Sequence, residues 1–148
     1  MEPFAPFDVS QPSVVQSTDL PAVSIVIPCR DEERFLDACL ESLIANSYPQ
    51  SLLEILIVDG MSMDQTRTIA RRYAQRYPHI RLLENARQTI PAAMNMGILQ
   101  SSGEIILKAD AHSMYPPNYI EGCVRHLLDF KADMTGGVWV IAPREDTH

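Results

Sequence analysis

The 148-residue sequence has no apolar run near the roughly 20 residues that a membrane-spanning helix requires. Its N-terminus lacks a charged start followed by a continuous apolar segment, so it is a poor match to a secretory signal. Hydrophobic residues still make up 46% of the composition, which argues against disorder. We therefore expect one globular domain over residues 22–148, preceded by a flexible, proline-containing arm over residues 1–21.

Basic residues are the minority, and the formal net charge is −7. A general nucleic-acid-binding protein normally presents a basic face, so we expect no nucleic acid polymer among the partners. Four arginines do cluster in the segment TRTIARRYAQR: Arg67, Arg71, Arg72 and Arg76. We interpret them as the solvated face of a helix, with contact to anionic lipid or a protein partner as the alternative.

Two common phosphate-binding motifs are also missing. The turn after the first apolar run reads PCRDEE, where a dinucleotide-binding fold would need G-x-G-x-x-G. No phosphate-cradling P-loop is present either. Cysteine is scarce, and the odd number of three (Cys29, Cys39 and Cys123) within apolar patterns predicts reduced, buried thiols and not a disulfide framework.

Short apolar runs alternate with helical patterns along the chain. The runs are rich in β-branched residues, as in strands that are covered on both faces. The expected strands are 23–28, 54–60, 80–84, 104–110 and about 133–142. The expected helices are 31–47, 64–78, 89–100 and 118–130, with Asp31 capping the first and with Asn118 and Glu121 close to a capping box in the last. This order predicts an α/β fold with a mostly parallel sheet and helices on both faces.

Three of these expected strands end in polar segments: IPCRDEE, IVDGMSMDQT and LKADAHS. In an open α/β sheet, ligands bind beyond the carboxyl ends of the strands. Unpaired carboxylates at one edge raise each other's pKa, and a bound divalent cation or hydrogen-bonding ligand would relieve that repulsion. The carboxyl edge of the sheet is therefore the expected site.

Each acidic residue also has a structural alternative. Asp59 and Gly60 form a strong turn pair, so Asp59 can simply accept backbone hydrogen bonds. Because two other strand ends are polar too, we favour ligand contact, for example with the imide N–H of uracil. Asp64 is equally suited to capping the next helix and to ligand contact. Of Glu32 and Glu33, we expect one to be solvated and one to face the rim.

Asp110 and His112 lie two residues apart after the third of these runs. On extended backbone their side chains point the same way, so both can reach one ion. Mn²⁺ accepts imidazole, whereas Mg²⁺ prefers oxygen ligands. A surface turn is the alternative, because Asp, Ser and Pro are common in turns. The position after a buried strand favours a metal site.

Three segments together resemble the family 2 glycosyltransferases with the GT-A fold: VSIVIPCRDEERFLDACLESLIANSYP, EILIVDGMSMDQTRTIARRYA and NMGILQSSGEIILKADAH. The likeness covers about residues 22 to 142. The segment DAHSMYPPNY is most similar to the bacterial exopolysaccharide enzymes of the succinoglycan-biosynthesis type. The resemblance implies transfer of a sugar, with inversion, from a nucleotide-diphospho-sugar such as a UDP-sugar to a polysaccharide or lipid-linked saccharide acceptor. It also implies a divalent cation, Mn²⁺ or Mg²⁺, and a cytoplasmic location at the inner face of the membrane.

The resemblance also assigns residues. Asp59 would bind the base, Arg87 would approach the ribose or sugar-phosphate, and Asp110 with His112 would take the place of the D-x-D metal element. The implied nucleotide-sugar site comprises Pro28, Arg30, Glu32, Asp59, Gly60, Ser62, Arg87, Asp110 and Ala111.

The sequence departs from the family pattern in two ways. His112 stands where the family usually has Asp, so contact with sugar or phosphate is the alternative to metal binding. Family members also continue past the strand around Trp139 into an acceptor-binding half that supplies the general base, whereas this sequence ends at APREDTH. We expect Glu145 and Asp146 to be a frayed terminus, the base to lie beyond His148, and any membrane association to reside in those missing regions.

A non-catalytic nucleotide-binding module is the alternative function. A receiver-type signalling domain also gathers acids at strand ends but fits the VDGMSMDQT loop less well.

Overall fold

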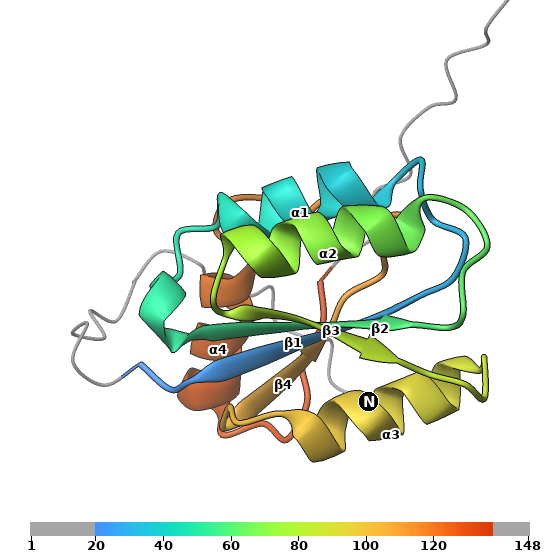
Figure 1. Ribbon diagram of the computed structural model, residues 1–148. Coiled ribbons are helices and arrows are strands. Elements are labelled where there is room, and N and C mark those ends of the chain that lie inside the picture. The colour runs from blue at the N-terminus through green and yellow to red at the C-terminus, as the bar shows by residue number, and fades with distance from the viewer. Residues whose placement is uncertain (1–19, 138–148) are drawn as a thin grey trace, which may run out of the picture.

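Strands and helices alternate along the whole of the computed structural model, which describes residues 20–137 (Figure 1). The strands are β1 (Val23–Cys29), β2 (Leu53–Asp59), β3 (Ile80–Glu84) and β4 (Ile105–Lys108). The helices are α1 (Leu36–Ile44), α2 (Thr66–Arg76), α3 (Ile90–Gln100) and α4 (Tyr119–Phe130), with a short 3₁₀ helix, η1 (Gln50–Leu52), before β2. Four of the five predicted strands and all four predicted helices are confirmed. Half of the fifth, 133–142, lies outside the described residues, and its described half, 133–137, is irregular.

The four strands form one parallel sheet in the order β3-β2-β1-β4. Ile25 at the centre of β1 pairs with Ile55 on one side and with Leu107 on the other. Strands β2 and β3 therefore follow on one side of β1, whereas β4 lies on its other side. Such a reversal of strand order leaves a crevice at the carboxyl ends of the two strands concerned, here β1 and β4.

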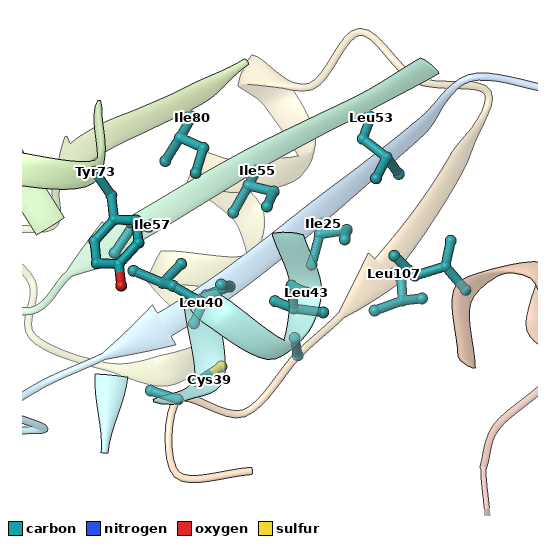
Figure 2. Packing of buried hydrophobic residues seen from close by; sticks show 14 of the residues in the cluster. Ile25, Cys39, Leu40, Leu43, Leu53, Ile55, Ile57, Tyr73, Ile80 and Leu107 are labelled. Atoms are coloured by element: carbon teal, nitrogen blue, oxygen red, sulfur yellow. The ribbon is translucent and has the colours of Figure 1, made fainter. Parts of the chain in front are cut away.

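Most of the hydrophobic core lies on one face of the sheet. Helices α1 and α2 lie along this face in Figure 1, and residues of α4 belong to the same buried cluster. Figure 2 shows Leu40 and Leu43 of α1 in the same cluster as Ile25 and Ile57 of the central strands. The opposite face is covered by α3. Burial on both faces explains why the central strands read as near-continuous apolar runs.

Helix α3 packs unusually close to β1. Gly97 lies in α3, and a Cβ added there would overlap the side chain of Val26. Val26, Leu56, Val58 and Ala93 form the small buried cluster between α3 and the sheet. The close approach brings the first turn of α3 near the carboxyl ends of β1 and β2.

One expected helix start, that of α1, and one expected capping interaction, that of α4, are wrong. Helix α1 begins at Leu36, not near Asp31, because Asp31 has a positive φ of 55° and cannot continue a right-handed helix. Its N–H donates to Ser62 Oγ at 2.9 Å and its Oδ1 accepts from the Met63 N–H at 2.8 Å. At α4, Asn118 makes no side-chain cap, and Glu121 instead accepts from Ser47 Oγ at 3.1 Å. Contacts between distant segments replace the local caps.

The cysteine prediction is confirmed for Cys29 and Cys39, which are buried free thiols, while the free thiol of Cys123 is half-buried. Within residues 20–137, no helix has both the length and the apolar character that crossing a membrane requires.

Candidate functional site

A cleft of about 170 Å³ opens at the carboxyl edge of the sheet, at the β1–β4 reversal. The ends of β1, β2 and β4 and the segment from β3 into α3 all contribute to it. Its lining residues are Pro28, Cys29, Arg30, Glu32, Gly60, Asn85, Gln88, Thr89, Ile90, Ala93, Lys108, Asp110, Ala111 and His112. Seven of the ten predicted site residues are among them: Pro28, Arg30, Glu32, Gly60, Asp110, Ala111 and His112.

Backbone hydrogen bonds hold the strand ends together where the cleft begins. The Ala109 N–H donates to the Val26 carbonyl at 2.9 Å, which continues the β1–β4 pairing by one bond. On the other side, the Gly60 N–H donates to the Cys29 carbonyl at 2.8 Å. The segments that carry Arg30 and Asp110 therefore leave the sheet from fixed positions.

Asp110 pairs with Lys108 in the cleft, a residue that the sequence reasoning missed. The ion pair joins Lys108 Nζ and Asp110 Oδ1. Strand β4 ends at Lys108, and residues 111 and 112 form a turn, so the extended backbone expected over 110–112 is wrong. Side chains two residues apart point to the same side only where the backbone is extended. Here this condition brings together Lys108 and Asp110, and not Asp110 and His112.

His112 has a different partner from Asp110. Its Nδ1 lies 3.1 Å from Glu32 Oε1, which connects the segment after β1 to the turn after β4. Among residues 20–137, no group of three or more His, Cys, Asp or Glu side chains is arranged to hold a metal ion. An ion shared by Asp110 and His112 therefore stays a prediction.

The backbone of Asp110 is anchored from the core side. Its N–H donates to Tyr115 Oη at 2.7 Å, and the Cys39 thiol contacts its carbonyl oxygen at 3.5 Å. Burial raises the pKa of Tyr115, and burial raises the pKa of Cys39 to about 12, so both groups are neutral donors or acceptors at ordinary pH. These contacts hold the Asp110 backbone, from which the carboxylate extends, in a fixed position.

Asp59 and Ser62 lie beneath the cleft and do not line it. Asp59 has 0% of its surface exposed, and its Oδ1 accepts from Ser62 Oγ at 2.5 Å. Arg67 Nε lies 3.4 Å from Asp59 Oδ2. The Ser62 N–H also donates to Asp59 Oδ2 at 3.2 Å, so the structural alternative for Asp59 is realised. Contact between Asp59 and a base stays a prediction.

Asn85 organises the other side of the cleft and was also missed. Its side chain donates to the Thr89 carbonyl at 2.9 Å and accepts from the Arg87 N–H at 3.2 Å. Its own N–H donates to the Asp59 carbonyl at 2.8 Å. Arg87 itself is exposed and is not a lining residue. Asn85 directly follows β3, so the strand-end rule that selected the other segments would have found it.

The two remaining acids join neighbouring loops. Asp64 is not the N-cap of α2, which is Gln65, but its Oδ1 accepts from the Thr66 N–H at 2.9 Å just before the helix. Glu33 Oε2 accepts from the Gln65 N–H at 2.9 Å, while Glu32 lines the cleft. The prediction that only one of the two glutamates faces the rim is confirmed.

Strained backbone gathers around the cleft. Four non-glycine residues within 20–137 have positive φ, and three of them, Asp31, Met61 and Gln88, lie in loops next to it or line it. Such conformations cost roughly 1–3 kcal/mol each and are typical of binding sites.

Comparison with known proteins agrees with this architecture. Residues 24–148 match the family described as Glycosyl transferase family 2. The chain is 34% identical over 122 residues to Glycosyltransferase AglE of Haloferax volcanii, an alignment that spans 82% of this chain and 40% of that relative. It is 36% identical over 111 residues to Succinoglycan biosynthesis protein ExoA of Rhizobium meliloti, spanning 74% of this chain and 33% of that relative.

A solved structure gives the same picture in three dimensions. The mannosyltransferase PcManGT from Pyrobaculum calidifontis, in complex with GDP-Man and Mn²⁺, superposes with a TM-score of 0.69 at 27% identity. The match covers 80% of this chain and 36% of PcManGT. The chain thus spans about 40% or less of the length of these relatives. A parallel sheet with its cleft at the strand reversal, together with these matches, shows that the chain belongs to glycosyl transferase family 2 and has the GT-A fold.

Proposed function

We propose that the cleft binds the nucleotide-diphospho-sugar donor of a glycosyltransferase, and that the longer protein transfers the sugar to a polysaccharide or lipid-linked saccharide. The observation that carries this proposal is the meeting of acidic and cationic side chains from β1 and β4 at the reversal of strand order. A lipid-linked acceptor would place the reaction at the cytoplasmic face of a membrane. The succinoglycan pathway named for ExoA and the GDP-Man bound to PcManGT support the same assignment.

The charges in the cleft suit a diphosphate leaving group. When the bond between sugar and phosphate breaks, negative charge develops on the nucleoside diphosphate, and fixed cations stabilise it. Arg30 and Lys108 supply two cationic side chains to the cleft lining. Arg87, in the neighbouring loop, would reach the ribose or sugar-phosphate once the donor is bound.

The residues present fit a divalent cation that is shared with the donor. Glu32 and Asp110 offer carboxylate oxygens, and His112 offers a nitrogen in the same cleft. A hard cation is commonly held by one or two carboxylates together with substrate phosphates, and not by a complete protein cage. Mn²⁺ or Mg²⁺ bound in this way would supply Lewis-acid stabilisation of the leaving diphosphate. Asp110 is our main candidate ligand, with His112 as a second ligand or a sugar contact.

Small residues leave room for the donor at the cleft floor. Gly60 directly follows β2, Ala111 lies in the turn after β4, and both line the cleft together with Pro28 of β1. We propose that the nucleoside lies here, above the Asp59–Ser62 pair. An acceptor hydroxyl would attack the anomeric carbon from the opposite face with inversion, assisted by a general base that the acceptor-binding part of the longer protein supplies.

Calorimetric titration with UDP and with GDP, each with and without Mn²⁺, tests the donor site. We expect binding of one nucleotide that strengthens with Mn²⁺, and loss of that metal-dependent gain in Asp110→Asn, while the exposed Asp133→Ala control binds like the wild type. Folded protein that binds neither nucleotide under any condition would overturn the proposal. Binding without sugar transfer by the longer protein would favour the non-catalytic module.

A further inference from the structure

The pair formed by Lys108 and Asp110 occupies the part of the cleft that the proposed function assigns to a metal and a diphosphate. Lys108 is one of only two lysines in the sequence. The pair is partly open to solvent, with 44% of the lysine side chain and 25% of the aspartate side chain exposed. A ligand arriving in the cleft therefore meets an aspartate that already has a cation.

The two partners differ in how freely they can move. Three contacts fix the Asp110 backbone: its N–H donates to Tyr115 Oη at 2.7 Å, and its carbonyl accepts from the Cys39 thiol at 3.5 Å and from the Ser113 N–H at 3.0 Å. Lys108, in contrast, carries its ammonium on a flexible four-carbon chain. Displacing the ammonium leaves the carboxylate in place.

We propose that Lys108 is the internal counter-ion of Asp110 in the ligand-free protein and moves to the donor's diphosphate when a divalent cation binds Asp110. This inference rests on the proposed function and adds a residue to it. The ammonium and the divalent cation compete for one carboxylate, because both carry positive charge and cannot occupy the same oxygen. Once displaced, the ammonium lies beside the site of a new anion, the diphosphate, and lysine is a common phosphate-binding residue.

The proposal makes two predictions of opposite sign for Lys108→Gln. Without nucleotide, removal of the competing ammonium strengthens Mn²⁺ binding roughly two- to fivefold, the range expected for a partly exposed ion pair. With saturating Mn²⁺, the same variant binds the nucleoside diphosphate about tenfold more weakly, because a charge-assisted hydrogen bond is lost. A residue that merely supported the local fold would shift both affinities in the same direction.

Mn²⁺ affinity is measured from the electron paramagnetic resonance signal of the free ion, with the metal alone as the probe. The variants are Lys108→Gln, Lys131→Gln as a matched charge-removal control outside the cleft, and Asp110→Asn, in which the carboxylate is absent. Lys108→Met repeats the test if the glutamine variant does not fold by circular dichroism. We expect tighter Mn²⁺ binding only in the Lys108 variants and the weakest binding in Asp110→Asn.

Calorimetry then compares UDP, GDP and uridine in the presence of Mn²⁺. We expect weaker diphosphate binding in Lys108→Gln and unchanged uridine binding. Equal Mn²⁺ affinities in wild type and Lys108→Gln, or metal and diphosphate affinities that fall together, would overturn the role of Lys108. Failure of the proposed function has a different signature, because the wild type itself would then bind no nucleoside diphosphate.

Discussion

The carboxylates at the two ends of the sheet differ in how many hydrogen-bond partners the protein gives them. At the amino end, Glu54 of β2 receives hydrogen bonds from Ser24 at 2.6 Å, from the Ser102 N–H at 2.9 Å and from Arg81 at 3.1 Å. At the carboxyl end, Glu32 and Asp110 line a cleft, and each carboxylate has one side-chain partner, His112 and Lys108 respectively. The protein uses the first carboxylate to join three segments and leaves the others where a ligand can reach them.

The pKa of Glu54 shows how completely its site is satisfied. Burial alone would raise the pKa, but the hydrogen bonds from Ser24, Ser102 and Arg81 outweigh burial and hold the pKa below its ordinary value of 4.5. Asp59 is at the carboxyl end but resembles Glu54, since it is fully buried and bonded to Ser62. The number of protein donors, more than the edge on which a carboxylate lies, separates structural from ligand-accessible acids.

Asp59→Ala should have the largest effect on stability. It removes the buried acceptor of the Ser62 N–H and hydroxyl and one of the two carboxylates that Arg67 contacts, the other being Glu84, and the combined loss should cost about 3 kcal/mol. Urea denaturation followed by circular dichroism measures the change, with Asp133→Ala as an exposed control that should stay within about 0.5 kcal/mol. A loss below about 1 kcal/mol for Asp59→Ala would contradict its structural role.

The glycines at the two ends should respond differently to an added methyl group. A Cβ at Gly103 would lie 2.5 Å from the Ser24 nitrogen, in a segment tied to β1, so Gly103→Ala should destabilise the protein by about 2 kcal/mol. A Cβ at Gly60 would lie 3.4 Å from Arg30 Cβ and from the Cys29 carbonyl oxygen, which is ordinary contact. Gly60→Ala should therefore cost less than about 1 kcal/mol and weaken UDP binding by narrowing the cleft. Similar unfolding free energies for Gly103→Ala and Gly60→Ala would contradict the expected difference in packing between the two ends of the sheet.

Glu54→Gln should cost about 1 kcal/mol at pH 7 without affecting nucleotide binding. Because the folded-state pKa of Glu54 lies below 4.5, its contribution is complete above the unfolded pKa and is lost as the pH falls through the folded pKa. The stability gap between wild type and variant should therefore shrink below about pH 4.5 in urea denaturation curves recorded at several pH values. A gap that widens on acidification would refute the lowered pKa. Glu104→Gln serves as the exposed control.

Two half-exposed arginines give the smallest stability effects and the clearest separation of roles. Arg30 is 50% exposed in the cleft, and Arg81 is 43% exposed at the amino end beside Glu54. Arg30→Ala should change stability by less than about 0.5 kcal/mol but weaken UDP binding about tenfold. Arg81→Ala should lower stability by up to about 1 kcal/mol and leave UDP affinity unchanged. If both variants bind UDP equally well, Arg30 has no donor contact.

The sequence predicted the central strands well because they are buried on both faces. Predicted strand 23–28 differs from β1 (Val23–Cys29) by one residue, and predicted strand 54–60 is shifted by one residue from β2 (Leu53–Asp59). Short apolar runs rich in β-branched residues are typical of such buried parallel strands. Predicted strand 80–84 coincides with the edge strand β3 (Ile80–Glu84), which is only partly buried. The start of α1 was missed because Asp31 bonds to Ser62 and Met63, which are about thirty residues away and invisible to local pattern.

The location of the site was predicted from the sequence, but the ion pair between Lys108 and Asp110 was not. Reading polar strand ends as one edge brought Arg30, Gly60 and Asp110 together correctly. The last residue of β4 could not be read from the apolar run, because the length of β4 is set by its pairing with β1. The last pair in this ladder is Val26 with Lys108. The strand end therefore places Lys108 beside Asp110, an ion pair that the sequence did not predict.

The most direct test of the account is a ¹⁵N–¹H correlation spectrum of the chain titrated with UDP and Mg²⁺, a diamagnetic substitute for Mn²⁺. We predict that amide signals at the carboxyl edge shift, above all those of Gly60, Gln88 and Ala111, while those of Glu54, Ser102 and Gly103 at the amino edge stay in place. Shifts centred on the amino edge, or none at the β1–β4 reversal, would contradict the assignment of the cleft as the donor site.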